Sequence, residues 1–226
     1  MRIAVLGTGM VGQALAGRLD ELGHDVAVGT RDPVVTMART DPDAMGTPAF
    51  GEWAAAHPSV RIASMADAVE GTDLVVNATS GAVALAALGE AGADRLAGTV
   101  VLDISNPLDF SRGFPPTLFV KDSDSLGEQI QAAFPAAKVV KSLNTLTAAL
   151  MVNPRQLADG DHSVFVSGND AEAKALVTDL LRSFGHTDVI DLGDISTCRG
   201  TEMLMPLWLR LMGTLGTGMF NIKVVR

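Results

Sequence analysis

The sequence from residue 2 to residue 12 reads Arg-Ile-Ala-Val-Leu-Gly-Thr-Gly-Met-Val-Gly. An apolar, strand-forming run here leads into a GxGxxG pattern, with glycines at positions 7, 9 and 12. In such a turn the first glycine permits a sharp bend, the second lets the backbone approach a pyrophosphate, and the third lets the following helix pack closely on the strand. The amides at the start of that helix face the anion. The pattern therefore predicts a dinucleotide-binding turn made of Gly7, Thr8, Gly9, Met10, Val11 and Gly12.

Strand-like and helix-like segments alternate through the first two thirds of the chain. A helix is predicted over 10–22, because apolar residues recur there at helical spacing and Gly23 follows, a residue typical of helix ends. The predicted strands are apolar at consecutive positions, which is typical of strands covered by helices on both faces. They are 2–6, 25–29, 60–63, 73–78, 99–104 and 138–142. This alternation predicts an α/β fold with a doubly wound parallel sheet of the Rossmann type.

The pattern of the chain changes after residue 147. A helix predicted over 147–152 is followed by a strand at 163–166, a helix at 170–184 and a strand at 188–192. A helical tail that contains several methionines comes next. We therefore expect two domains, a dinucleotide-binding domain over 1–147 and a small C-terminal domain of mixed α/β and helical structure over 148–226.

Composition and charge restrict the classes of partner. Of the 226 residues, 47% are hydrophobic and 19% charged, which is typical of a globular protein rather than a disordered one. The net charge of −9 disfavours nucleic acid and anionic membrane surfaces as partners, so an anionic ligand must be held by local groups. The apolar stretch at 203–220 is interrupted by Pro206 and Arg210, so no membrane span is predicted. One cysteine, Cys198, allows neither an internal disulfide nor a thiolate metal cluster; we expect a cytoplasmic protein without a metal site.

The end of the second predicted strand distinguishes two nucleotides. A site for NAD places a carboxylate there to accept a hydrogen bond from the ribose 2′-hydroxyl, whereas the 2′-phosphate of NADP requires donors and positive charge. This chain carries Gly29-Thr30-Arg31. Because a guanidinium binds phosphate in bidentate fashion, Thr30 and Arg31 predict NADP. Asp32, one position further along, is a candidate for orienting Arg31, and Arg39 is a candidate for adding positive charge.

Small, neutral side chains follow the other predicted strands, at the edge of the sheet where doubly wound proteins bind ligands. They lie in Asn77-Ala78-Thr79-Ser80, in Ser105-Asn106-Pro107 and in Leu143-Asn144-Thr145. The predicted contacts for ribose and the nicotinamide amide are Asn77, Ala78, Thr79, Ser80 and Asn106. We expect the turn-rich loop at 105–116 to face the ligand as well.

No general acid, base or nucleophile stands out at these strand ends, so no catalytic residue is predicted. Direct hydride transfer between two redox cofactors needs proximity and orientation, and it needs no proton donor from the protein. The four histidines, His24, His57, His162 and His186, lie in predicted turns or loops, where exposed side chains are usual. Lys141 lies within a predicted strand and is a further candidate for contacting an anionic substrate.

Five segments together carry a family resemblance: residues 2–12, 28–31, 139–145, 165–170 and 218–223. They span nearly the whole chain and resemble the coenzyme F420-dependent NADP oxidoreductase family; a similar dinucleotide module precedes the membrane part of the mammalian metalloreductases. The resemblance implies a homodimer in which a Rossmann domain holds NADP and the C-terminal domain covers a cleft for the deazaflavin F420. It implies that residues 8–11 contact the pyrophosphate, Thr30 and Arg31 the 2′-phosphate, and residues 77–80 with Asn106 the nicotinamide side.

The identity of the second substrate has several possible answers. Its candidate contacts are Pro107, Asn144, Pro206 and Leu207. The family carries a histidine beside the deazaflavin where this chain has Asn144, so reduction of a flavin or of another acceptor is an alternative. An imine or hydroxyacid reductase is a rival prediction, but the tail lacks the lysine-and-asparagine helix motif of the β-hydroxyacid dehydrogenases. A redox sensor that binds NADP without turnover is a further alternative, and it predicts an exposed apolar patch for a partner.

Overall fold

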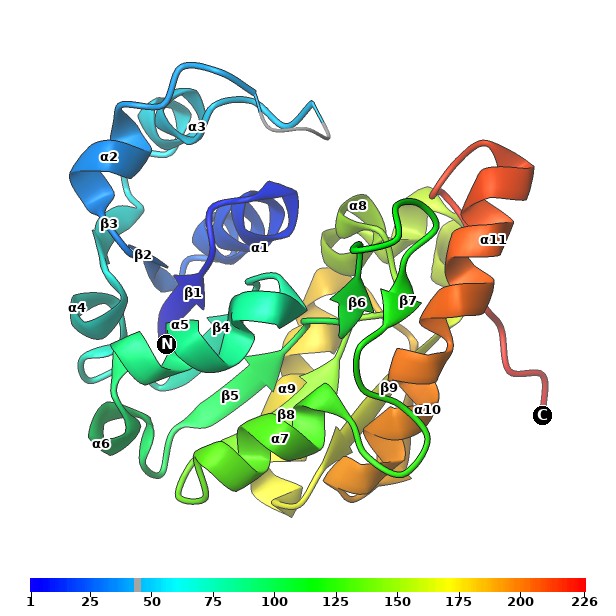
Figure 1. Ribbon diagram of the computed structural model, residues 1–226. Helices are drawn as coiled ribbons and strands as arrows, with labels where there is room; N and C mark the ends of the chain where they lie inside the picture. Colours follow the sequence, from blue (N-terminus) through cyan, green and yellow to red (C-terminus); the bar gives the residue numbers. More distant parts are fainter. Residues whose placement is uncertain (43–45) are drawn as a thin grey trace.

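The computed structural model describes residues 1–42 and 46–226, and a single sheet lies at its centre (Figure 1). Within the described residues, this sheet has eight strands in the order β10-β9-β8-β5-β4-β1-β2-β3. Their bounds are β1 (Arg2–Leu6), β2 (Asp25–Thr30), β3 (Arg61–Ser64), β4 (Leu74–Asn77), β5 (Val100–Asp103), β8 (Lys138–Ser142), β9 (Ser163–Gly168) and β10 (Asp188–Gly193). All neighbouring strands are parallel except β8 and β9. Each strand predicted from the sequence is present, which confirms the doubly wound, mostly parallel α/β fold.

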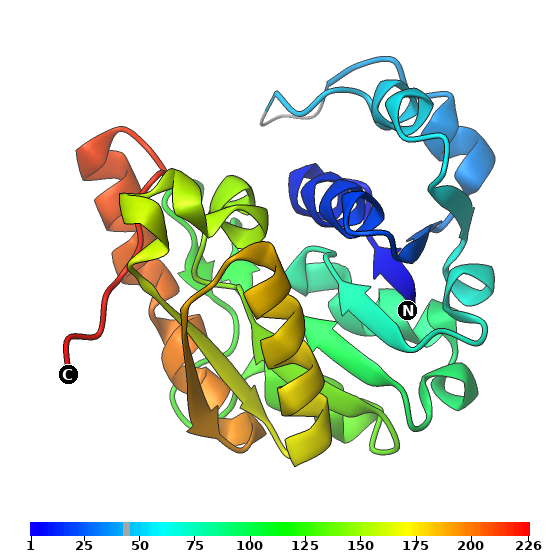
Figure 2. The ribbon, with the colours of Figure 1, turned by 180° about the vertical axis from the view of Figure 1, so that it is seen from behind.

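Helices cover both faces of the sheet, as Figures 1 and 2 show from opposite sides. One face packs against α1 (Met10–Glu21), α3 (Phe50–Ala56), α8 (Ala148–Val152) and α9 (Ala171–Phe184). The other packs against α4 (Met65–Val69), α5 (Ala84–Ala91), α6 (Ala93–Leu96), α7 (Leu126–Ala133) and α10 (Cys198–Met203). The strands therefore bury apolar side chains on both faces, which is why their sequences do not alternate between apolar and polar residues.

A short hairpin and the last helix pack together beside the main sheet. The hairpin pairs β6 (Leu108–Asp109) with β7 (Thr117–Leu118), and α11 (Met205–Leu215) packs on it through Trp208. The sequence predicts a loop over 105–116, but β6 lies inside this segment, so it is only partly a loop. Two residues per strand are too few for a recognisable sequence pattern. The remaining elements are α2 (Pro33–Met37) and the 3-10 turns η1 (Gly81–Val83), η2 (Pro154–Gln156), η3 (Ala158–Gly160) and η4 (Ile195–Thr197).

Residues after position 147 continue the sheet rather than starting a separate one. β9 pairs with β8, and β10 pairs with β9. Leu150 of α8 and Val164 of β9 share one apolar core with Ile3 of β1 and Leu15 of α1. The expected boundary between 1–147 and 148–226 thus crosses a continuous core, and the division into two domains stays a prediction.

The glycine turn after β1 brings α1 very close to the strand. A Cβ atom at Gly12 would lie 2.1 Å from the carbonyl oxygen of Gly7, and one at Gly7 would lie 2.6 Å from the carbonyl oxygen of Ala78. Gly7 also has a φ of +121°, a conformation that residues with side chains rarely adopt. Both positions therefore require glycine, and the resulting contacts place the start of α1 beside the ends of β1 and β4.

Two of the four histidines are buried, which corrects the prediction that all of them are exposed in loops. The exposed fractions of His162 and His186 are 3% and 2%, and the other two are partly exposed. The Nε2 atoms of His162 and His186 each lie 3.0 Å from a backbone carbonyl oxygen, that of Pro154 and that of Met151 respectively. Burial lowers the pKa of His186 to about 4. These rings are covered by segments distant in sequence, which local turn residues do not indicate.

Replacing Gly12 by alanine should destabilise the protein by about 3 kcal/mol, because the new methyl group must displace the Gly7 carbonyl. Gly89→Ala is the matched control, since a Cβ at this position of α5 meets no atom within 4 Å. That change should be neutral or should stabilise by up to about 1 kcal/mol. Denaturant unfolding followed by circular dichroism measures both free energies. Equal losses in the two variants would contradict the packing argument.

The free energy of unfolding should fall as the pH drops from about 6.5 to about 4. The pKa of His186 is lower in the folded protein than in the unfolded chain, so the unfolded chain binds the extra proton in this interval. The loss from this group is at most about 1.4 kcal/mol per pH unit. His186→Gln should flatten the slope, as measured by denaturant titrations at neutral and at mildly acidic pH. Parallel slopes in the two proteins would show that His186 is not the titrating group.

Candidate functional site

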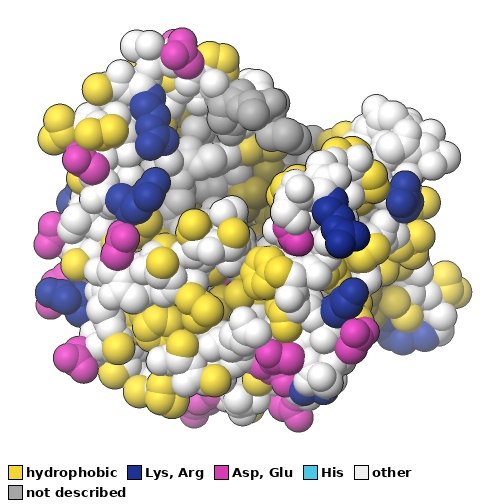
Figure 3. All heavy atoms as spheres, viewed as in Figure 1, with side chains coloured by type: hydrophobic (Ala, Val, Ile, Leu, Met, Phe, Trp, Pro, Cys, Tyr) yellow, Lys and Arg dark blue, Asp and Glu magenta, His cyan; other side chains and the backbone are white. Residues whose placement is uncertain are grey.

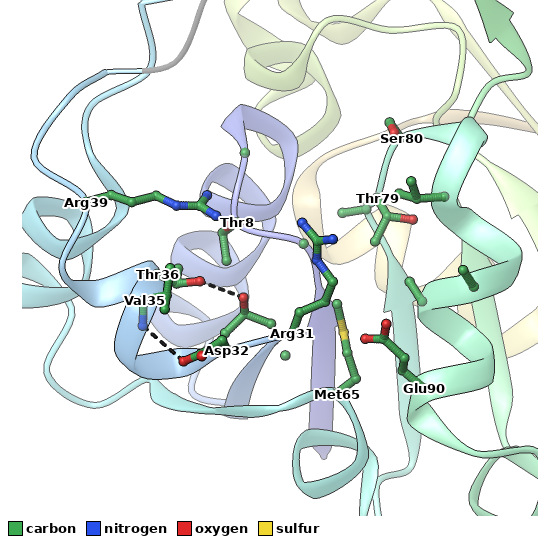
Figure 4. Close-up of a pocket in the computed structure, with 18 residues that line it drawn as sticks. Thr8, Arg31, Asp32, Val35, Thr36, Arg39, Met65, Thr79, Ser80 and Glu90 are labelled. Atoms are coloured by element: carbon green, nitrogen blue, oxygen red, sulfur yellow. Dashed lines mark hydrogen bonds between the residues drawn. The ribbon is translucent and has the colours of Figure 1, made fainter.

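Two cavities adjoin at the carboxyl ends of the strands. The first has a volume of about 550 Å³, lies beside the ends of β1 and β2, and is shown in close-up in Figure 4. The second has a volume of about 280 Å³, lies beside the loops after β4, β5 and β8, and is bounded by α11. Ala78, Thr79 and Ser80 line both, so the two cavities form one cleft.

The glycine turn forms part of the wall of the first cavity. Gly7, Thr8 and Gly9 line it. A Cβ at Gly9 would meet no atom within 4 Å, so the backbone faces open space there. Of the other predicted turn residues, Val11 lines the second cavity and Met10 lines a further cavity near α1, α3 and α8. The turn thus leaves room for an anion to approach its backbone amides.

Two guanidinium groups and two hydroxyl groups border the first cavity near the end of β2. Arg31 directly follows β2, Arg39 follows α2, and both side chains point into the cavity in Figure 4. Within ranges 1–42 and 46–226, neither guanidinium forms an ion pair with a carboxylate. The hydroxyl oxygens of Thr30 and Thr36 are hydrogen-bonded at 2.8 Å. This end of the cavity therefore offers positive charge and donors to an anionic group.

Asp32 does not orient Arg31, which corrects that prediction. Its Oδ1 accepts a hydrogen bond from the backbone N–H of Val35 at 3.0 Å and so caps the first turn of α2. Glu90 of α5 adds a carboxylate on the opposite side of the cavity (Figure 4). The capping bond holds the Asp32 carboxylate at the start of α2 and leaves Arg31 available to a ligand.

Asn77 lies behind the cleft wall rather than in it. Its side chain is fully buried and lines neither cavity, so the predicted direct contact with nicotinamide needs correction. Its Nδ2 donates to Asp103 Oδ1 at 2.8 Å, and its Oδ1 accepts from Thr79 Oγ1 at 2.7 Å. The last side chain of β4 points into the sheet face under α5 and α7. Asn77 therefore acts on the cleft through Thr79, which lines both cavities.

The second cavity has a polar wall and an apolar wall. Asn144 Nδ2 donates to Asn106 Oδ1 at 2.9 Å, and Asn106 Nδ2 donates to the Asn144 carbonyl oxygen at 2.8 Å. Ser105 completes the polar wall, and Met205 and Trp208 lie in the apolar one. None of the described residues that line this cavity is charged or titratable. Such a lining suits a flat, uncharged ring rather than a carboxylate.

Three of the four predicted contacts for a second substrate lie outside this cavity. Pro107 is buried beside it, and Pro206 and Leu207 are exposed on α11. Met205 and Trp208 line it instead, because residues three apart lie on one helix face. The apolar spacing at 205, 208, 209 and 212 is the sequence signal that identifies this inner face. In the described part of the chain, the buried Nε1 of Trp208 has no hydrogen-bond partner.

Lys141 is not available to an anionic substrate, contrary to its sequence-based candidacy. It is 1% exposed, and its Nζ lies 2.7 Å from Asp103 Oδ2 and 2.8 Å from Glu202 Oε1. Burial disfavours the ammonium form, but the two carboxylates outweigh this effect and raise the pKa of Lys141. Asp103 and Glu202 were not among the residues predicted from the sequence. The signal for the first was a charged residue at the end of an apolar strand, beside a second strand that contains a lysine.

Throughout the described ranges, no helix has the length and apolar character needed to cross a bilayer. No group of three or more histidine, cysteine, aspartate or glutamate side chains in those ranges could hold a metal ion. Burial raises the pKa of the Cys198 thiol to about 11, so the thiolate that would react is disfavoured.

Known proteins resemble this chain in sequence and in fold. Residues 2–107 match a family model described as NADP oxidoreductase, coenzyme F420-dependent. A crystal structure from an Arthrobacter species, described as a candidate F420-dependent NADP reductase, is 61% identical with a TM-score of 0.96, and the match covers 100% of both chains. Metalloreductase STEAP3 of Rattus norvegicus is 30% identical over 97% of this chain and 40% of its own length. The F420-dependent NADP reductase of Methanocaldococcus jannaschii is 32% identical over 52% of this chain and 52% of its own length.

These matches differ in how much of each protein they cover. The chain spans only 40% and 52% of the length of the two curated relatives, so the activity of either whole relative is not assigned to this chain. The Arthrobacter structure is matched from end to end, at an identity well above that needed to share a family. The family model covers the glycine turn, the end of β2 and the loops after β4 and β5. Together these findings show that the chain belongs to the F420-dependent NADP oxidoreductase family.

Proposed function

We propose that the protein is an NADP-dependent oxidoreductase that transfers hydride directly between NADP(H) and coenzyme F420. The observation that carries this proposal is one cleft made of two unlike cavities. Guanidinium groups that pair with no carboxylate of the described residues border the first, and uncharged described side chains line the second. A dinucleotide in the first and a flat redox ring in the second would meet at residues 78–80, which line both. Membership of the F420-dependent NADP oxidoreductase family supports the same pair of substrates.

The first cavity would hold the adenine half of NADP. The amides of Gly7, Thr8 and Gly9 would face the pyrophosphate, as the open space at Gly9 allows. Thr30 and Arg31 would bind the 2′-phosphate, and Arg39 would add positive charge. The nicotinamide half would extend from the first cavity into the second, past Val11 and Thr79 toward Asn106.

The protein would act on hydride transfer by binding and orientation. When bound, the nicotinamide donates or accepts the hydride. Asn106 and Asn144 hold each other in place and present amide groups to the second cavity, while Met205 and Trp208 exclude water from its other side. Because the described lining holds no titratable side chain, the proton that accompanies the hydride would be exchanged with solvent rather than with a protein group.

A second candidate is reduction of a flavin or of another acceptor by NADPH. The similarity to metalloreductase STEAP3 over 97% of this chain favours it, since that relative is not described as F420-dependent. Asn144 stands where the family resemblance implies a histidine, which is consistent with a different second ring. The hydroxyacid reductase alternative is disfavoured, because a substrate carboxylate would meet no cation among the described residues that line the second cavity.

We also propose that residues 148–226 cover the acceptor side of the cleft and join two copies into a homodimer. α11 bounds the second cavity, and its outer side exposes 53% of Leu207 and 54% of Leu215. The neighbouring hairpin segment exposes Phe114, and apolar side chains recur across this face in Figure 3. Burial of these side chains in a second copy would remove apolar surface from water. Sedimentation equilibrium measures whether the protein in solution is one chain or two. The cytoplasmic location stays a prediction.

Arg31→Ala should weaken binding of NADPH by about 10- to 100-fold, because a charge-assisted phosphate contact is lost. Binding of NADH, which lacks the 2′-phosphate, should change by no more than about twofold. Arg61→Ala on β3 is the matched control, since Arg61 does not line the cavity. Fluorescence titration of the nicotinamide measures each affinity. Equal losses for NADPH and NADH would overturn the assignment of the 2′-phosphate to Arg31.

Hydride transfer should be observed when the purified protein is mixed with NADPH and oxidised F420. The absorbances of NADPH and of the acceptor are followed together, with FMN and riboflavin in separate reactions. Stoichiometric loss of NADPH with F420 alone is the expected result. Turnover with flavins alone would overturn the F420 assignment in favour of a flavin reductase. Tight NADPH binding without any turnover would favour a redox sensor.

A further inference from the structure

A row of buried polar side chains crosses the sheet behind the cleft wall. Asn77, Asp103 and Lys141 are neighbours in register on the adjacent strands β4, β5 and β8. Each of the three is at most 1% exposed. Polar side chains on an apolar sheet face are unfavourable unless each has a hydrogen-bond partner, and these three bond to one another.

The Lys141 ammonium fixes the orientation of the Asp103 carboxylate. Its Nζ contacts Asp103 Oδ2 at 2.7 Å and donates to the carbonyl oxygen of Ser105 at 2.5 Å. The other carboxylate oxygen, Asp103 Oδ1, accepts from Asn77 Nδ2 at 2.8 Å and from Ser105 Oγ at 2.7 Å. One buried ion pair therefore ties the loop after β4 to the loop after β5.

Both loops carry residues of the cleft at the point where the two cavities meet. Thr79 donates from Oγ1 to Asn77 Oδ1 at 2.7 Å and lines both cavities. Ser105 lines the second cavity and precedes Asn106, which pairs with Asn144. The chain of bonds from Lys141 thus ends at the nicotinamide side of the proposed NADP site. Among the described residues, this chain of bonds has no member at the end of β2, where the 2′-phosphate is proposed to bind.

We infer that Lys141 and Asp103 form a positioning pair that holds the loops around the nicotinamide half of NADP without touching the ligand. The inference rests on the proposed function. The pair sets the positions of Thr79 and Ser105 through buried bonds, so its loss should affect the nicotinamide half and spare the adenine half.

Glu202 provides the matched comparison. It is the second carboxylate on the same ammonium, with Oε1 at 2.8 Å from Lys141 Nζ. Its other bonds come from the backbone N–H groups of Leu126 and Gly127, at the start of α7, and from the Cys198 thiol on its own helix, and not from either loop. Asp103→Asn and Glu202→Gln therefore each remove one negative charge beside Lys141, but the first alone disturbs the connection to the cleft.

Calorimetric titration of both variants and the wild-type protein tests the inference. The two ligands are NADPH and adenosine 2′,5′-bisphosphate, which carries the adenine and the 2′-phosphate without nicotinamide. Asp103→Asn should lower the affinity for NADPH about tenfold and change that for the bisphosphate by no more than about twofold. Glu202→Gln should leave the ratio of the two affinities at its wild-type value.

The ratio of affinities separates positioning from general stability. An equal change of this ratio in Asp103→Asn and Glu202→Gln, or no change in Asp103→Asn, would overturn the positioning role. Ser105→Ala removes the Oγ bond to Asp103 without a change of charge and decides the matter if Asp103→Asn does not fold; about a threefold fall in the ratio is expected. A wild-type protein that does not bind NADPH would instead overturn the proposed function itself.

Discussion

The contact between α1 and the end of β1 is the constraint on which the cleft depends. Because Gly12 has no side chain, the helix lies against the carbonyl of Gly7, where a Cβ would come within 2.1 Å. This contact places the start of α1 between β1 and β4, which lie side by side at the point where the strand order reverses. The open backbone at Gly9 and the loop after β4 both take their positions from it. A cleft at this edge of the sheet is therefore a consequence of close helix packing.

The second constraint is a charge in the core. Lys141 is almost fully buried, and its desolvation is offset by Asp103 and Glu202, which come from a neighbouring strand and from α10. α10 leads directly into α11, whose Met205 and Trp208 line the second cavity. The Asp103 side of this ion pair leads to the loops that line the cavity, whereas the Glu202 carboxylate is bonded to the start of α7. The buried ammonium therefore links the strand-end loops to the sheet through one carboxylate and α7 to α10 through the other.

Local pattern predicted the strands and the glycine turn but not the roles of individual polar side chains. Asp32 was assigned to Arg31 because the two are adjacent, whereas the free backbone amides at the start of α2 compete for its carboxylate and bind it. Pro206 and Leu207 were predicted as substrate contacts, whereas helical spacing places Met205 and Trp208 together on the side of α11 that faces the cavity. In both cases the geometry of the helix, and not the neighbouring residue in sequence, determines what a side chain contacts.

The sequence by itself determined the fold class, the position of the glycine turn and the positive charge that follows β2. Each depends on a pattern of a few neighbouring residues. The patterns are continuous apolar runs, glycines at positions where other residues do not fit, and the residue that follows a strand. The tertiary structure alone decided that Asn77 and Lys141 are buried and that Asn106 and Asn144 face the second cavity. The reason is distance along the chain, since Asn106 bonds to Asn144 across 38 positions and Leu126 bonds to Glu202 across 76, and no local pattern records such pairings.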